Sequence, residues 1–440
     1  MGQNVSNFDN MLKEHYMDKV PEQVNQKIAL NEHFAKRSGA EFSADGRQVT
    51  YPLHTGRNSG TGSIGERGKL PTAGAQQYLS VSIPFRFTYG RIEITSQAMK
   101  QSMTSKGAFR KAVDEEITRA AKDVGRVKNR QLWGYGKGIL AKVKLGLTGT
   151  AVTVYAAGGV NHDSGVGLNG YRFLKVGQLI AIVTAAGAIE DQAEIASFST
   201  NSTTTWTVTF STSVTCTTGS FLCDVSTLTS PALIDCAYNR EPMGLLGLID
   251  DGTYLDDFFG NSRGAYPILN ANTRAASVFS ASSYLTLNGI QSMYDITDQT
   301  GNGSPKVMWA HHSVRREYLN LLQTFRRYND AQAKSPDGGF KGNALESEIT
   351  FAEKPLKVDR DCPYGILFGV DDSKMFRYVL SEAEWADDDG KILLRVAGVD
   401  AYEARFRCFD NYMCDAPNTC FTITGLALTS PNVIESIQGL

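Results

Sequence analysis

The stretch Tyr78–Thr95, YLSVSIPFRFTYGRIEIT, decides the fold of this chain. Its period of two predicts a β-strand with one apolar face. Extended over about 18 residues at ~3.3 Å each, the strand would span roughly 60 Å, against a radius of gyration of ~13 Å for a 100-residue domain. It must therefore bend or project beyond its own domain. The side chains that carry the alternation are Leu79, Val81, Ile83, Phe85, Phe87 and Tyr89.

A second alternation, at Val49, Tyr51 and Leu53, precedes this strand. The glycine-rich stretch 56–74, GRNSGTGSIGERGKLPTAG, separates the two. Together they predict a two-stranded ribbon with a glycine-rich tip. Because such a ribbon is barely stable alone in water, we expect its apolar face to pack on a partner subunit, as a reaching arm.

The spacing of apolar residues predicts two short helices over residues 8–37. Residues 107–133 form the clearest predicted helix. Apolar residues recur at helical spacing from Phe109 to Val127, which gives one apolar stripe on a helix about 40 Å long. The other face mixes basic residues with four acids. It could therefore contact phosphates nonspecifically, or form a solvated, salt-bridged surface. The basic residues considered for phosphate contact are Lys122, Arg126, Lys128 and Arg130.

Composition changes sharply at residues 148–227, which are rich in Ser and Thr and contain two basic residues, Arg172 and Lys175. Alternation such as Trp206–Val208–Phe210 predicts strands, so this segment is interpreted as a small all-β module inserted in the chain. After residue 230 the pattern is α+β, with a strand at Val307–Ala310 between two helices. The first of these helices is expected over Leu285–Asp298, with Ser282 or Ser283 as its cap.

Charge and cysteine content narrow the class of protein. The 440 residues carry 44 basic and 46 acidic side chains, and the pI of about 6.3 excludes the global cationic field of a dedicated nucleic-acid binder. Seven cysteines without a CxxC pair indicate buried thiols in a reducing compartment rather than a zinc site. The longest apolar run, 179–189, is far shorter than the ~20 residues of a membrane span. We expect a soluble protein made in a cytoplasm, with no metal or cofactor.

Two short motifs match functional patterns but are better explained without a bound nucleotide or an attached lipid. Gly60–Gly65, GTGSIG, fits the GxGxxG pattern of dinucleotide-binding folds, which leaves a nucleotide-binding enzyme using the 56–74 loop as an alternative function. However, the following ERGKLP is a poor start for the helix that such a site needs. Met1–Ser6 satisfies the myristoylation pattern, which often arises by chance.

The order of these parts resembles the major capsid protein of tailed bacteriophages, with the Hong Kong 97-like fold. The resemblance rests on the ribbon with its glycine-rich tip, the long helix, two helices around a strand, and the late strands in DGKILLRVAGVDAYEARFRCFDNYMC. It implies an α+β fold in seven segments. These are an N-terminal arm (1–45), an extended β-hairpin loop (46–100), a peripheral domain with a spine helix (101–147), an inserted β-rich domain (148–227), more peripheral domain (228–282), an axial domain (283–384) and C-terminal peripheral strands (385–440).

The resemblance also implies a structural function rather than an enzymatic one. Copies would form the pentamers and hexamers of an icosahedral phage head around double-stranded DNA, located in the virion and made in the host cytoplasm. Portal, scaffolding and decoration proteins are the implied partners; since only some 45 residues precede the ribbon, a separate scaffolding protein is expected. Lys122, Arg126, Lys128 and Arg130 are the candidates for contact with the genome. Inter-subunit contacts would come from Arg57, Glu66, Arg67, Lys69, Phe85 and Phe87.

Two alternatives stay open at this point. Some relatives join subunits by a Lys–Asn isopeptide bond, for which Lys69 and either Asn411 or Asn418 could serve here. No glutamate is clearly placed to assist, so noncovalent assembly is expected. A cellular nanocompartment shell of the same fold is the other alternative, although the extra β module and the length of the chain argue against it.

Overall fold

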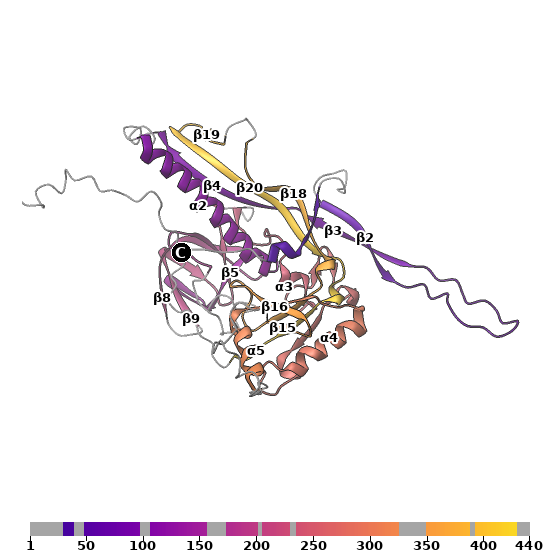
Figure 1. Ribbon diagram of the computed structural model, residues 1–440. Coiled ribbons are helices and arrows are strands. Elements are labelled where there is room, and N and C mark those ends of the chain that lie inside the picture. The colour runs from indigo at the N-terminus through magenta and orange to yellow at the C-terminus, as the bar shows by residue number, and fades with distance from the viewer. Residues whose placement is uncertain are drawn as a thin grey trace, which may run out of the picture.

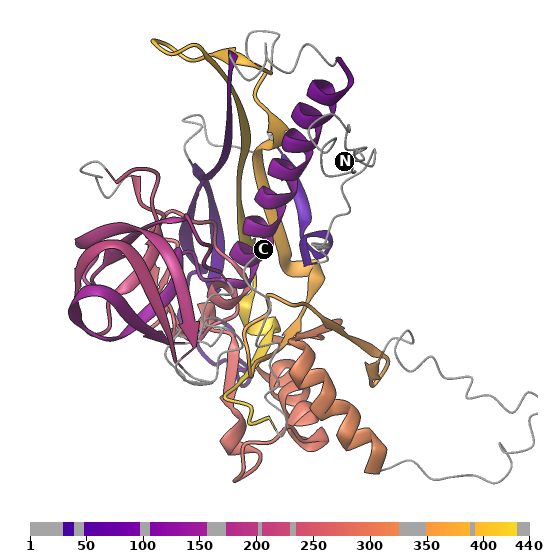
Figure 2. The same cartoon turned by 90° about the vertical axis from the view of Figure 1, so that its left-hand side faces the viewer.

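The computed structural model describes residues 30–38, 48–96, 106–155, 173–200, 205–228, 235–324, 349–387 and 392–428. In these ranges the chain forms two mixed sheets, a closed barrel and a hairpin that projects far from the body (Figure 1). Figure 2 shows the barrel, the first sheet with its long helix, and the lobe with two helices as three bodies that meet near the middle of the molecule.

The N-terminal helices expected over residues 8–37 lie mostly outside the described residues. Their described end differs from the prediction, because Leu30–His33 form a 3-10 turn (η2) and Ala35–Ser38 form a strand (β1). Strand β1 pairs in parallel with β18 (Met375–Trp385) at the edge of the first sheet. This pairing with a distant segment overrides the local helical pattern.

The first sheet is built around one long central strand, β20 (Ala401–Cys414). Strands β4 (Arg86–Thr95), β18 and β19 (Leu394–Arg395) all pair with it in antiparallel fashion. The long helix α2 (Lys106–Trp133) crosses one face of this sheet, as Figure 1 shows, and confirms the helix predicted over 107–133. A Cβ atom at Gly90 of β4 would lie 2.7 Å from Val124 of the helix, so glycine is what lets the two elements approach.

The long strand predicted over 78–95 changes partner at Phe85. Its first part, β3 (Gln77–Pro84), pairs with β2 (Gln48–Gly56) in the hairpin, and its second part is β4 of the first sheet. The side chains of Val49, Val81 and Ile83 are buried in this chain's own core. The expectation that the apolar face of the ribbon packs on a partner is therefore wrong for the root of the hairpin.

The Ser- and Thr-rich segment forms a closed six-stranded barrel with its own apolar core. Alternation explains the barrel, because Trp206, Val208 and Phe210 point inward and the hydroxyl side chains between them point outward. It begins at Ile139, earlier than the expected residue 148. Its strands are β5 (Ile139–Leu145), β6 (Leu147–Tyr155), β7 (Leu179–Val183), β8 (Ile189–Thr200), β9 (Thr205–Cys216) and β10 (Phe221–Asp224).

The second sheet carries helices α4 (Leu287–Gly301) and α5 (His312–Thr324). The side chain of Thr286 accepts a hydrogen bond from the N–H of Gly289, and so caps α4 where Ser282 or Ser283 was expected. Two strands of this sheet come from outside the expected range 283–384, while β18 of that range belongs to the first sheet. In order the strands are β13 (Asn272–Ala275), β21 (Phe421–Thr424), β17 (Leu367–Val370), β14 (Val307–Ala310), β16 (Lys354–Val358) and β15 (Thr350–Phe351).

A segment of short elements between the sheets is held by one buried cation. The guanidinium of Arg263 is fully buried and donates hydrogen bonds to the carbonyl oxygens of Asp250, Leu269 and Gly247. These bonds satisfy both the charge and the loop backbone. The short elements are α3 (Leu245–Leu248), β11 (Asp257–Phe258), β12 (Asn261–Ser262), η5 (Pro267–Leu269), η6 (Ala276–Val278), η8 (Asp372–Lys374) and η9 (Pro417–Thr419).

All seven cysteines are buried and free, which confirms the interpretation as buried thiols. In the described ranges no group of three or more His, Cys, Asp or Glu side chains is placed to hold a metal ion. No helix among the described residues is both long enough and apolar enough to cross a membrane.

Candidate assembly surfaces

The projecting hairpin offers a long exposed surface. Every residue from Thr61 to Leu70 is exposed, and the hairpin stands clear of the body along its outer half (Figure 1). Apolar side chains on it face solvent, with Leu70 82% exposed and Tyr78 67% exposed. Exposed apolar groups on a projecting arm indicate a surface made to be covered by another molecule.

The glycines of the arm have a structural role at its neck. A Cβ atom at Gly74 would lie 2.4 Å from the Oδ1 atom of Asn58, and one at Gly60 would lie 2.8 Å from the backbone nitrogen of Gly74. The two sides of the neck therefore approach more closely than residues with side chains allow. At the tip, the N–H of Gly68 donates to the carbonyl of Gly65 at 2.9 Å, which closes a tight turn.

Four of the six predicted contact residues lie exposed on this arm: Arg57, Glu66, Arg67 and Lys69. Phe87 is 55% exposed on β4 of the first sheet. Phe85 is different, because only 4% of its surface is exposed and it packs in the central core. The prediction of Phe85 as an inter-subunit contact is wrong. Phe85 lies where the strand changes its pairing partner, and its side chain points into the core of its own chain.

An aromatic cluster that the sequence reasoning missed surrounds Phe87. Its ring and that of Tyr89, which is 64% exposed, both make edge-to-face contacts with Phe409, at centroid distances of 4.9 and 5.4 Å. The three side chains lie on the face of the first sheet opposite α2, because their neighbours Thr88 and Ile92 are the buried ones. The sequence does not show that Phe87 pairs with Phe409 across the strands. The alternation places Phe87 and Tyr89 on one face of the strand, and this was the available signal for an aromatic cluster.

The root of the arm is fixed by Asn411, a buried residue of β20. Its side-chain amide donates to the carbonyl oxygen of Pro84 at 2.6 Å, and its Oδ1 atom accepts from the N–H of Met243 at 2.9 Å. Asn411 is thus buried and hydrogen-bonded within its own chain, which argues against it as the partner of Lys69 in an isopeptide bond. Asn418 lies in a polar groove on the other side of the arm.

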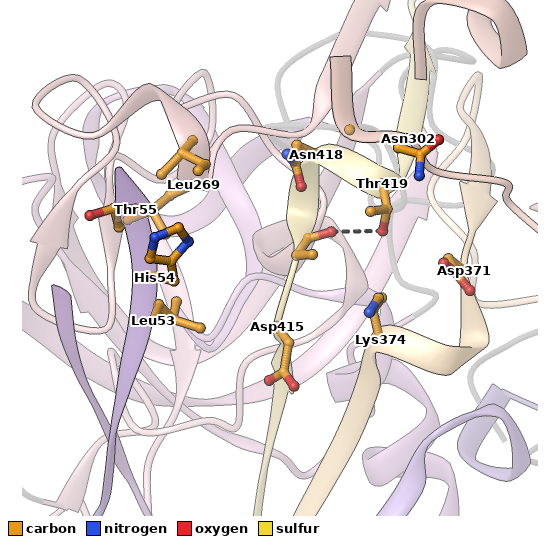
Figure 3. Close-up of a pocket in the computed structure, with 13 residues that line it drawn as sticks. Leu53, His54, Thr55, Leu269, Asn302, Asp371, Lys374, Asp415, Asn418 and Thr419 are labelled. Atoms are coloured by element: carbon orange, nitrogen blue, oxygen red, sulfur yellow. Dashed lines mark hydrogen bonds between the residues drawn. The ribbon is translucent and has the colours of Figure 1, made fainter. Parts of the chain in front are cut away.

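The polar groove, of about 380 Å³, separates the arm strand β2 from the body (Figure 3). Its two carboxylates have structural partners: Asp415 lies 3.6 Å from Arg37, and Asp371 caps the N–H of Ser373 at 3.1 Å. The groove is thus a polar gap beneath the arm rather than a catalytic arrangement of nucleophile and base. The residues drawn in Figure 3 with labels are Leu53, His54, Thr55, Leu269, Asn302, Asp371, Lys374, Asp415, Asn418 and Thr419.

The basic residues of α2 divide into two groups. Lys122 is exposed, and Arg126 forms an ion pair with Asp123 at 2.8 Å on the surface. Lys128 and Arg130 were wrongly predicted to face a genome: Lys128 is buried against Asp410, and Arg130 forms a two-pronged contact with Glu241. They lie near the end of the helix, where it enters the core between the sheets.

Asp410 is the fully buried centre of an ionic cluster. Lys128 from α2 contacts its Oδ1 atom, and Arg377 from β18 donates to its Oδ2 atom at 2.9 Å. Burial alone would raise the pKa of Asp410, but the positive charges and hydrogen bonds of Lys128 and Arg377 outweigh it and hold the pKa below the usual 3.8. The cluster joins the helix to two strands of the sheet, so its role is structural.

The fold is similar to that of a chain in a solved phage capsid. The chain resembles a chain of the cyanophage A-1(L) capsid asymmetric unit, with a TM-score of 0.59 at 11% identity over 96% of this chain and 99% of that one. The capsid of the Myoviridae phage XM1 is also similar, with a TM-score of 0.46 at 8% identity over 94% and 97% of the two chains. No protein-family model and no curated protein sequence matches this chain.

Proposed function

We propose that this chain is the major capsid protein of a tailed bacteriophage, whose copies form the pentamers and hexamers of an icosahedral head around double-stranded DNA. The observation that carries the proposal is the similarity to a cyanophage capsid subunit over nearly the full length of both chains. In this proposal the hairpin β2–β3 is the extended loop, α2 is the spine helix, and the second sheet with α4 and α5 is the axial domain. The barrel is an inserted domain.

The exposed surfaces support self-assembly. The arm presents unburied apolar and charged side chains that its own body does not cover, and the Phe87–Tyr89–Phe409 cluster is a second uncovered apolar surface. Covering surfaces of this kind between many copies is what holds a shell together, since large interfaces well above ~1,600 Å² are typical of permanent assemblies. Individual exposed ion pairs at the arm would each contribute at most ~1 kcal/mol.

The proposal also includes the assembly partners of the chain and its location in the virion. The chain would be made in the host cytoplasm and reside in the virion, with portal and scaffolding proteins as assembly partners, and would contact packaged DNA nonspecifically. Exposed cations of α2 such as Lys122 are the remaining candidates for that contact. No catalytic function is proposed.

A nucleotide-binding enzyme is not supported. Gly60–Gly65 lies in exposed coil within the hairpin and leads back into strand β3, whereas a dinucleotide site needs a strand followed by a helix N-terminus. The glycines are explained by the narrow neck of the arm instead.

The test is an arm-shortening variant. Replacing residues 57–76 with the turn sequence Asn-Gly keeps β2 and β3, whose apolar side chains belong to the core. We expect the variant to fold with a cooperative thermal transition like that of the full chain but to stay as subunits in size-exclusion chromatography, while the full chain forms capsomers or shells. Shells formed equally well by the shortened chain would contradict the role of the arm.

A further inference from the structure

Two cysteines lie on one face of a short antiparallel pairing where the chain leaves the barrel. Directly after β10, Val225 forms an antiparallel bridge with Cys236. The N–H of Ala237 donates to the carbonyl oxygen of Asp224 at 2.8 Å, which fixes this register. Side chains two residues apart on a strand share a face, and residues directly opposite each other on paired strands point to the same face. Cys223, two residues before Val225, therefore projects to the same side as Cys236.

Both side chains are buried in one apolar cluster at this end of the barrel. Cys223 is 0% exposed and Cys236 is 2% exposed. They share the cluster with Ile139, Val183 and Tyr238. Within it, the thiol of Cys223 donates a hydrogen bond to the sulfur of Cys236. The two sulfur atoms are thus neighbours, as the formation of a disulfide bond requires.

The two thiols differ in acidity. The hydrogen bond from Cys223 and one from the backbone N–H of Tyr238 stabilise a thiolate at Cys236. They outweigh burial and the negative charge of Asp224, and lower the pKa of Cys236 to about 7. The same hydrogen bond, together with burial, raises the pKa of Cys223 well above its ordinary value. Because the thiolate is the nucleophile, Cys236 is the attacking sulfur and Cys223 holds the proton.

Cys414 and Cys420 form a second thiol pair, which serves as a comparison. Their side chains are also joined by a hydrogen bond, but both are fully buried in the central core. The hydrogen bond and burial raise the pKa of Cys414 well above its ordinary value. Buried thiols of this kind are inert. We therefore expect this pair to stay reduced in the folded chain.

We propose that Cys223 and Cys236 form a redox-active dithiol that reduces hydrogen peroxide and closes to a disulfide bond. The Cys236 thiolate attacks one peroxide oxygen and the O–O bond breaks, so that the sulfur becomes a sulfenic acid and the departing hydroxide takes up a proton to leave as water. The sulfur of Cys223 then attacks the sulfur of Cys236, the S–O bond breaks, and hydroxide leaves with the Cys223 proton as a second water. Two thiols lose two electrons, and one peroxide becomes two waters.

The disulfide would tie β10 to the paired segment 235–238, which follows it in the chain. It would close a loop with twelve residues between the two cysteines, and so restrict the unfolded chain. Hydrogen peroxide suits the site better than a bulky disulfide oxidant, because both sulfur atoms are buried. The site belongs to the folded subunit, so the inference goes beyond the proposed function and does not depend on shell assembly.

The test uses the full chain, reduced, freed of reductant and treated with hydrogen peroxide between about pH 5 and about pH 9. We expect two of the seven thiols to be lost, at a rate that is half-maximal near pH 7, and to return with dithiothreitol. Protease cleavage before Asp224 and Asp235 places the two cysteines in separate peptides. Mass spectrometry without reduction should find these peptides linked.

Variants assign the role of each sulfur. Cys236→Ser should leave Cys223 reduced, whereas Cys223→Ser should leave Cys236 as a sulfenic acid that a 1,3-dione reagent traps. Cys216→Ser is the control, since it removes another buried thiol of the barrel, one whose pKa is raised by burial. This variant should lose two thiols as the parent does.

Seven unreacted thiols in the folded parent would overturn the inference, and so would equal reaction of all seven. A disulfide between Cys414 and Cys420 in place of the proposed one would also overturn it. A sulfenic acid that persists at Cys236 in the parent would overturn the assignment of Cys223 as its partner. Each of these results leaves the proposed function intact.

Discussion

The side-chain amide of Asn411 donates a 2.6 Å hydrogen bond to the carbonyl oxygen of Pro84, and so ties the central strand of the first sheet to the root of the arm. The pairing of β3 with β2 ends at Pro84, and the pairing of β4 with β20 includes Arg86, two residues further on. The hydrogen bond thus sits where one extended segment leaves the hairpin and enters the sheet. It sets the direction in which the arm leaves the body.

We predict that Asn411→Ala lowers the free energy of unfolding by about 1–3 kcal/mol, because it removes the hydrogen-bond partner of the Met243 N–H and of the Pro84 carbonyl. Urea denaturation measures the change. Asn261→Ala is the control, since its amide also donates to an arm carbonyl, that of Ser80 at 3.2 Å, but is exposed. Equal losses in the two variants would contradict the role of Asn411.

The buried carboxylate of Asp410 predicts a dependence of stability on pH. Its folded-state pKa lies below the unfolded value, so the ionised form stabilises the fold fully above about pH 4, and this contribution is lost as the pH falls through the folded pKa. Asp410→Asn should cost about 3–5 kcal/mol near neutral pH, because Lys128 and Arg377 lose their counter-charge. It should also flatten the acid side of the stability profile.

The control for Asp410 is Asp123→Asn on the exposed face of α2, where the surface ion pair with Arg126 contributes about 0–1 kcal/mol. Unfolding curves between pH 3 and pH 7 distinguish the two carboxylates. A profile for Asp410→Asn parallel to that of the parent would show that the cluster does not depend on this charge.

Alanine substitutions at Phe85 and Phe87 should have different effects, the first on the stability of the subunit and the second on assembly. Phe85→Ala should destabilise the subunit by about 3–5 kcal/mol, as expected for a phenylalanine removed from a core. Phe87→Ala should cost at most ~1.5 kcal/mol, the value of its aromatic contacts, yet reduce assembly yield. Thermal unfolding and size-exclusion profiles of both variants check this, and normal assembly of a folded Phe87→Ala chain would exclude the aromatic cluster from the interface.

Two glycines of the arm predict opposite outcomes for the same substitution. Gly74→Ala places a methyl group 2.4 Å from Asn58 and 2.8 Å from the backbone of Ser59, so the neck must open. Gly65→Ala meets nothing within 4 Å. We expect Gly74→Ala to impair assembly without lowering subunit stability by more than about 1 kcal/mol, and Gly65→Ala to assemble normally. Identical behaviour of the two variants in assembly assays would contradict the claim that assembly depends on the close approach of the two sides of the arm at Gly74.

Local patterns predicted the elements whose periodicity is uninterrupted. The helix over 107–133 and the strand Val307–Ala310 appear as expected. All four residues of the strand are buried, as an uninterrupted apolar run predicts. The barrel strands followed from alternation, but the start of the barrel at Ile139 did not, because β5 contains Lys142 and Lys144 and so lies outside the segment that is poor in basic residues. The boundaries of the lobes were hardest to predict, because they depend on strand pairing between segments far apart in the sequence. Strand β21 pairs within the second sheet and β18 within the first, although the sequence order suggested the reverse.

The candidate surface could be predicted only in part. Exposed charges at the arm tip followed from the glycine-rich composition, whereas Phe85 and Phe87 look equivalent in an alternating pattern. Only the change of partner at Phe85 determines which of them is buried. Likewise, Lys128 and Arg130 resemble the other cations of α2, and their burial depends on distant Asp410 and Glu241.

The central claim is that copies of this chain build a closed shell. The most direct measurement is to express the full chain, alone and together with a candidate scaffolding protein, and to inspect the purified material by negative-stain electron microscopy after size exclusion. The account predicts closed shells, or at least regular pentamers and hexamers. A folded chain that stays monomeric under both conditions would contradict it.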